Sequence, residues 1–163
     1  MEKVALDGHF KIPIIGFEKA YFFGSGWNFS VMTGNDLPVD LTELDFNEVG
    51  FYICLDPGQS QITVEEKIAL LKKFGNTLCG VKAFASLWHD YILQQDKAES
   101  ALERIYKRRG ITDIDFPGCV FGIPNGDRRL ILRLSRSKGG RWTWAYHWFT
   151  EPCRGCNFSM VWR

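Results

Sequence analysis

The chain has 163 residues, of which 45% are hydrophobic, 24% charged and 15% aromatic, and its formal net charge is +1. This composition excludes a disordered or low-complexity chain, and the length fits one domain with a substantial core. The small net charge hides a division. Residues 1–63 carry three lysines against nine acidic residues, a net charge of −6, and residues 64–163 carry seventeen basic against ten acidic residues, a net charge of +7. Such a separation of charge along the chain can steer charged partners.

We expect neither a membrane span nor a secretory signal in this sequence. No apolar run approaches the length of a membrane span, and the first residues lack the pattern of a secretory signal. The five cysteines are odd in number and scattered. We therefore expect reduced thiols, a cytoplasmic location inside the host cell and no association with a membrane.

The first third of the chain favours β-structure. Residues 20–23 and 27–32 are two runs rich in aromatic and β-branched residues, and the glycines between them predict a turn that joins two strands. Residues 33–48 form a long acidic connection with a weak pattern. Residues 49–55 are a short apolar run followed by Asp-Pro-Gly, which predicts a further strand and a turn.

The middle of the chain predicts three helices, at about 64–74, 77–93 and 96–109. Thr63 and Glu66 have the spacing of a capping box at the start of the first helix. The second helix carries a wide apolar stripe, which predicts that it is the most buried of the three. The third helix begins at Asp96 and ends in three basic residues before Gly110, where cations and a glycine are both favoured.

The last third of the chain again predicts strands, at 119–123, 128–136, 141–149 and 157–162. Since strands flank a central block of helices, we predict one α+β domain over residues 1–163. Its sheet would be mainly antiparallel and would pack against the three helices. The glycines between the second and third of these strands predict a hairpin, in which three leucines at alternate positions face the core.

This hairpin supplies the best candidate binding surface. Guanidinium groups bind carboxylates and phosphates, and flat rings stack on bases and side chains. We therefore expect a small Trp-rich binding protein, of the inhibitor, immunity or virus-encoded docking type, whose partner is an acidic protein or a nucleic acid. A different interpretation is that the arginines cover aromatic surface and keep a sheet edge soluble. The candidate residues, called the basic hairpin below, are Arg128, Arg129, Arg133, Arg136, Lys138, Arg141, Trp142 and Trp144.

An alternative interpretation is an enzyme. Cys79 lies where the second predicted helix begins, a position that lowers the pKa of a thiol, and His147 and Asn157 follow on predicted strands. This order of cysteine, histidine and asparagine resembles that of papain-like hydrolases, and the resemblance rests on these three residues. It implies a cysteine nucleophile, a histidine base and an asparagine that orients the base. The opposing interpretation is that Cys79 is a small buried core residue.

A third interpretation concerns a metal. Cys153 and Cys156 form a CxxC pair, and His147 and Cys119 lie on predicted strands. Together the four residues could hold zinc, which prefers thiolate and imidazole ligands in a tetrahedron. The pair can equally form a simple turn, and the binding interpretation requires no cofactor. The sequence leaves the oligomeric state open.

Overall fold

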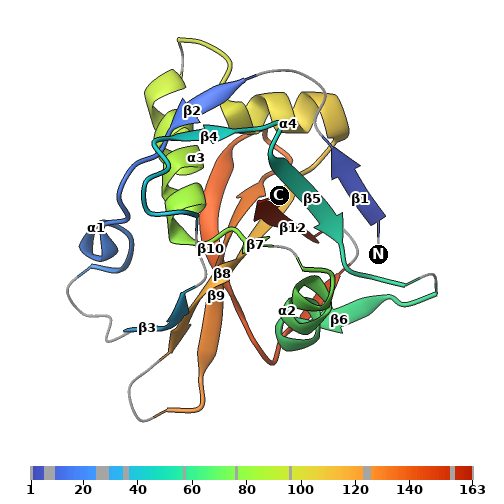
Figure 1. Ribbon diagram of the computed structural model, residues 1–163. Coiled ribbons are helices and arrows are strands. Elements are labelled where there is room, and N and C mark those ends of the chain that lie inside the picture. Colours follow the sequence, from blue (N-terminus) through green and yellow to red (C-terminus); the bar gives the residue numbers. More distant parts are fainter. Residues whose placement is uncertain are drawn as a thin grey trace.

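The computed structural model describes residues 2–5, 10–24, 30–34, 37–56, 58–75, 77–95, 97–122, 126–154 and 157–162. These residues form an α+β fold, as predicted, with a mixed central sheet and four helices (Figure 1). The helices are α1 (Lys19–Phe23), α2 (Val64–Lys73), α3 (Val81–Gln94) and α4 (Ala101–Arg109). The strands are β1 (Glu2–Ala5), β2 (Lys11–Pro13), β3 (Ser30–Gly34), β4 (Glu43–Asp45), β5 (Val49–Ile53), β6 (Gln61–Thr63), β7 (Thr77–Leu78), β8 (Asp113–Gly122), β9 (Arg129–Arg136), β10 (Trp142–Trp148), β11 (Pro152–Arg154) and β12 (Asn157–Trp162).

The central sheet has the strand order β1-β5-β12-β8-β9-β10, with β3 paired to β8 and β7 paired to β12. Strands β8 and β12 run parallel, while the other pairs are antiparallel. The prediction of a mainly antiparallel sheet is therefore only partly matched. The predicted hairpin is present as β9 and β10, which pair from Trp142↔Arg136 to Trp148↔Leu130.

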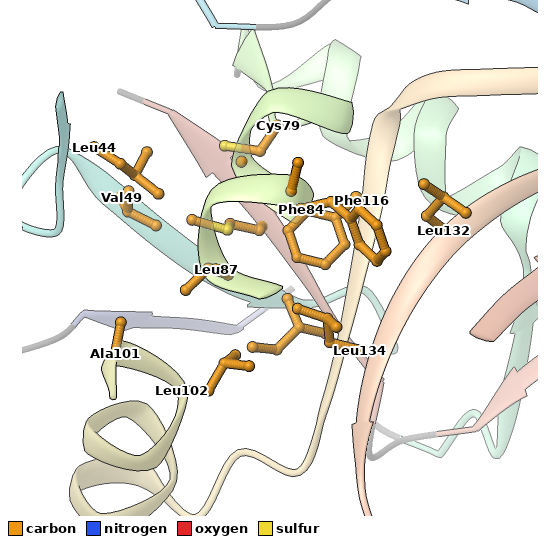
Figure 2. Packing of buried hydrophobic residues seen from close by; sticks show 14 of the residues in the cluster. Leu44, Val49, Cys79, Phe84, Leu87, Ala101, Leu102, Phe116, Leu132 and Leu134 are labelled. Carbon is orange, nitrogen blue, oxygen red and sulfur yellow. The ribbon is translucent and has the colours of Figure 1, made fainter. Parts of the chain in front are cut away.

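One face of the sheet, the main face, packs against α3 and α4. Phe84 and Leu87 of α3 meet Phe116, Leu132 and Leu134 of the sheet in a fully buried cluster, and α4 adds to the same core (Figure 2). Phe84 contacts Phe116 edge to face, with ring centroids 5.4 Å apart. The leucine row of β9 thus faces the core, as its alternation predicts.

The other face of the sheet, the second face, packs against α2 and the small sheet formed by β6 and β11. Figure 1 shows α2 and β6 together, on the side of the central strands away from α3. Val64 and Leu71 of α2 are buried against Ile131 and Val161 of the sheet. Strand β11 pairs antiparallel with β6, and this pairing places Cys153 opposite Ile62.

The helix starts differ from the predictions in two places. Residues 77–78 form strand β7, because Leu78 pairs with Val161 of β12, and α3 begins only after its N-cap Gly80. Helix α4 begins after its N-cap Ser100, whose hydroxyl accepts from the backbone N–H of Glu103, so it starts five residues later than predicted. Asp96, where the third helix was predicted to begin, lies outside the described residues. The Thr63 cap of α2 is confirmed, with both bonds of the capping box present.

Two predictions near the N-terminus also need correction. The run that was expected to be a strand at 20–23 belongs to helix α1, whose Phe22 and Phe23 pack into the main core. The acidic connection contains strand β4, which pairs with β2. Residues 25–29, which include two of the three residues of the predicted turn, are outside the described part of the chain. Among the residues described, no helix is both long enough and apolar enough to cross a membrane.

Candidate functional site

A cluster of polar side chains is buried on the second face of the sheet, beneath α2 and β11. Its members come from five elements, α2, β8 and the three consecutive strands β10, β11 and β12, and each is at most 9% exposed. Strand alternation explains the position of Asp115, because Ile114 and Phe116 on either side of it face the main core. The members, called the buried cluster below, are Lys67, Asp115, His147, Cys153 and Asn157.

An ion pair without contact to solvent links α2 to the sheet. Lys67 Nζ lies 2.6 Å from Asp115 Oδ2, and the two side chains are 1% and 0% exposed. Burial raises the pKa of Asp115, but the charge of Lys67 and a contact with His147 outweigh burial and hold this pKa below its ordinary value. Burial lowers the pKa of Lys67, yet Asp115 and the nearby thiols raise it above its ordinary value. Both groups are therefore charged at neutral pH.

His147 presents one ring nitrogen to the cluster and the other to Arg133. Nδ1 lies 3.5 Å from Cys153 Sγ, 3.6 Å from Asp115 Oδ1 and 3.4 Å from the amide nitrogen of Asn157. Nε2 lies 2.9 Å from Arg133 Nη1. A guanidinium group has only donors, so this contact requires a lone pair on Nε2. The ring proton of His147 then sits on Nδ1.

Two influences on the protonation of His147 oppose each other. Burial lowers the pKa of His147, whereas its contacts with Asp115 and Cys153 raise it. The contacts outweigh burial and bring this pKa to about 9. Arg133 acts against that rise, because a doubly protonated ring would point an N–H at donors 2.9 Å away. The contact with Arg133 decides the protonation state of His147, because two N–H donors cannot face each other at 2.9 Å. In this arrangement the ring is neutral, and protonation requires Arg133 to turn away.

The structure brings together two of the three residues of the predicted hydrolase site. His147 and Asn157 are neighbours, but Cys79 is fully buried in the main core, while the cysteine beside His147 is Cys153. In a nucleophile–base–orienter chain the histidine uses one nitrogen for the thiol and the other for the orienting residue. Here Cys153 and Asn157 meet the same nitrogen, and both are buried. The geometry therefore does not assemble a catalytic triad from these residues.

The structure also brings together only some of the predicted metal ligands. His147 and Cys153 lie in the buried cluster, whereas Cys119 packs in the main core and Cys156 lies outside the described residues. Asp115 lies beside His147 and Cys153, where Cys119 was expected. The sequence held one clue to Asp115: an acidic residue at an alternate position of an apolar strand must face either solvent or a buried partner.

The basic hairpin is divided between the two faces and the two ends of the strand pair. Arg133 faces the second side and contacts His147. Arg136 faces the main side, where it donates to both carboxylate oxygens of Glu103, at 3.1 and 3.2 Å. Trp142 is buried beside it and donates to the same carboxylate at 2.9 Å. Of the remaining candidates, Trp144 is half-buried against the main core, and Lys138 and Arg141 lie exposed at the hairpin turn.

Arg128 and Arg129 lie at the opposite end of the hairpin from the turn, and they line an open hollow of about 700 Å³, called the arginine hollow below. The guanidinium group of Arg128 lies over the ring of Trp148, 5.8 Å from its centroid, and that of Arg129 lies over Phe149 at 4.5 Å. Arg129 also approaches Glu65 at 3.5 Å, where both side chains are well exposed. The other lining residues are Thr63, Asp127 and Thr150.

The buried cluster and the arginine hollow differ in what they can do. The cluster is closed to a substrate and suits a structural or ion-binding role, whereas the hollow is open and presents guanidinium donors beside aromatic rings. Comparison with the models of known families, with curated proteins and with solved structures finds no match to this chain.

Proposed function

We propose that the protein works by binding an acidic segment of another protein, and that the arginine hollow receives this segment. The observation that carries the proposal is the stacking of two adjacent guanidinium groups on two rings, Arg128 on Trp148 and Arg129 on Phe149. The ring contacts help to hold each guanidinium group in place and leave N–H donors at the rim for an incoming carboxylate, which on Arg129 would compete with the exposed contact to Glu65. An inhibitor or docking factor of a reducing compartment, where the buried thiols stay free, fits this proposal.

The charges of the hollow favour a protein segment over a nucleic acid. Glu65 and Asp127 line the hollow together with Arg128 and Arg129, so its lining carries as many carboxylates as guanidinium groups. A strand of phosphates would meet repulsion from these carboxylates along with attraction. A peptide can place a carboxylate on each arginine and direct a backbone N–H or a basic side chain toward each acid. The rings then contact its apolar side chains.

The test is a direct binding measurement with two defined probes. A fluorescein-labelled peptide of alternating glutamate and tyrosine is titrated with the protein, and a single-stranded oligonucleotide of equal charge serves as the second probe. The peptide should bind, and Arg128→Glu with Arg129→Glu should weaken it by at least about a hundredfold, since the variant loses two charge-assisted hydrogen bonds, each worth about 1.5–3 kcal/mol. Circular dichroism should show an unchanged fold, because both side chains lie at the surface.

The matched control uses the other end of the same hairpin. Lys138→Glu with Arg141→Glu makes the same change of charge beyond the far end of β9, at least about 23 Å away, because Arg129 and Arg136 are already seven residues apart along the strand. This variant should keep its affinity for the peptide. Equal losses in both variants would show that net charge alone drives binding. Preference for the oligonucleotide, with a steep dependence on salt, would replace the protein partner by a nucleic acid.

A further inference from the structure

Three side chains of the buried cluster place an oxygen, a nitrogen and a sulfur atom close to one another. Asp115 offers an oxygen, His147 the nitrogen Nδ1 and Cys153 a sulfur, and these atoms all lie within 4.8 Å of one another. They come from β8, β10 and β11, so the small second sheet and the central sheet both contribute. All three residues are buried, which excludes an adventitious cluster at the surface.

The two distances from His147 Nδ1 to the other ligand atoms match the spacing in a metal's ligand shell. Nδ1 of His147 lies 3.5 Å from Cys153 Sγ and 3.6 Å from Asp115 Oδ1. In a tetrahedral zinc site, bond lengths of about 2.0–2.3 Å place neighbouring ligand atoms about 3.3–3.6 Å apart. At 3.6 Å, by contrast, a nitrogen and an oxygen no longer share a hydrogen bond.

Asp115 has one oxygen in use and one without a partner. Oδ2 is held by Lys67, whereas Oδ1 is fully buried and has no hydrogen-bond partner among the described residues. A buried carboxylate oxygen without a partner is costly, and such an atom needs an explanation. Oδ1 is the oxygen that faces His147 Nδ1. Lys67 thus orients the carboxylate from behind, as a second-layer partner of a metal ligand does.

We propose that Asp115, His147 and Cys153 form a zinc site that ties strand β11 to the central sheet. A soft thiolate, an imidazole and a carboxylate are all zinc ligands, and water completes a tetrahedron when the protein supplies three. Zinc displaces the proton of the Cys153 thiol, which leaves to solvent. The site differs from the one predicted from the sequence, because Asp115 replaces Cys119.

In the metal-free arrangement the contact of Arg133 with His147 disfavours zinc binding at this site. Zinc needs the lone pair of His147 Nδ1, so the ring proton must move from Nδ1 to Nε2, where Arg133 now donates. Arg133 must then turn away. Its contact with His147 is the one polar side-chain contact seen for it in the described chain, and its Nε is buried without a partner, so little holds it in place. Arg133 therefore lowers the affinity for zinc.

The test measures zinc and cobalt(II) binding to the full chain. The protein is stripped with a chelator, dialysed and titrated with zinc in the presence of a fluorescent competitor. One zinc per chain and a higher unfolding midpoint are expected. Cobalt(II) should give the intense absorption of a thiolate ligand and the visible bands of a four-coordinate ion. Absence of zinc binding at micromolar concentration, or a cobalt spectrum without a thiolate band, would overturn the site.

Variants identify the ligands. Cys153→Ser should lower the affinity for zinc by at least about tenfold, as should His147→Ala, whereas Cys119→Ser, a buried cysteine outside the site, should not. Loss with Cys119→Ser, or full affinity with Cys153→Ser, contradicts the assignment. If a variant does not fold, the cobalt spectrum of the unaltered chain still decides.

Arg133→Gln tests the exchange of the ring proton, since its amide oxygen can accept from Nε2–H. This variant should bind zinc about tenfold more tightly. An affinity no higher than that of the unaltered chain would rule out the exchange on which the site depends.

Discussion

Lys67 and Asp115 form an ion pair that is almost completely removed from water, with Nζ 2.6 Å from Oδ2. The pair joins helix α2 to strand β8, and Lys67 also donates to the backbone carbonyl of Asn157 at 3.4 Å. A lysine in the middle of an amphipathic helix would ordinarily extend to solvent. Here it lies between the buried residues Val64 and Leu71 of α2, so α2 turns a charged residue toward the sheet.

Removal of one partner of this pair should destabilise the fold strongly. Lys67→Met keeps the length of the side chain but leaves the carboxylate of Asp115 buried without its cation. The expected loss is about 3–5 kcal/mol in the free energy of unfolding, measured by urea denaturation.

The double variant Lys67→Met with Asp115→Val provides the control. Replacement of both charges by apolar groups should cost less than the single change at Lys67, since a buried pair is often exchanged for hydrophobic residues without loss. A double variant that loses the sum of the two single losses would show that the two residues act independently.

Local signals in the sequence predicted the elements that depend on nearby residues. The capping box of Thr63 and Glu66 places the start of α2 correctly, and the alternation of 128–136 places three leucines in the core. Strand β12 has the predicted bounds, 157–162. These features depend on helix and strand periodicity and on side chains within a few residues.

Features that depend on distant pairing could not be predicted. Strand β7 exists because Leu78 pairs with Val161, although the local pattern around it favours a helix. The site shows the same limit. Cys153 and His147 were recognised as ligand types, but only the pairing of β11 with β6 places Cys153 over the sheet, beside Asp115. One sequence shows which residues can carry chemistry, but not which of them meet.

The pH dependence of stability should report the burial of Cys54. Burial raises the pKa of this thiol to about 11, despite the opposing charge of Lys67. In the unfolded chain a cysteine ionises near pH 8.5. Between these two values the folded chain keeps a proton that the unfolded chain has lost, so stability falls as pH rises from about 8.5 to 11.

Cys54→Ser removes this ionisation. The slope of unfolding free energy against pH should become shallower in the variant, and the difference accumulated over the interval should be at most about 3 kcal/mol. The measurement is a series of urea denaturations at fixed ionic strength. Identical slopes for the two proteins would show that the Cys54 thiol ionises at the same pH in the folded and the unfolded chain.

Loss of the cap of α2 should have two separate effects. The Thr63 hydroxyl accepts from the backbone N–H of Glu66 at 3.2 Å, and the Glu66 carboxylate accepts from the backbone N–H of Thr63 at 2.9 Å. Thr63→Ala should cost about 1 kcal/mol of stability. The backbone N–H of Thr63 lowers the pKa of Glu66 most, and the hydroxyl of Thr63 lowers it further, so in this variant that pKa should rise part of the way toward its ordinary value, as followed by NMR. Thr63→Ser should behave like the unaltered chain. A serine variant that resembles the alanine variant would show that the hydroxyl does not stabilise α2.

Arg136 should matter for the stability of the hairpin, in contrast to Arg141 at its turn. The guanidinium of Arg136 donates to both oxygens of Glu103 and lies 3.7 Å from the centre of the Tyr106 ring, and its side chain is only 16% exposed. A lysine cannot reproduce the paired donors or the flat stacking surface. Arg136→Lys should therefore cost about 1–2 kcal/mol in thermal or urea unfolding, whereas Arg141→Lys, an exposed site, should stay within about 0.5 kcal/mol of the unaltered chain. Equal effects of the two changes would mean that the contact with Glu103 contributes no net stability.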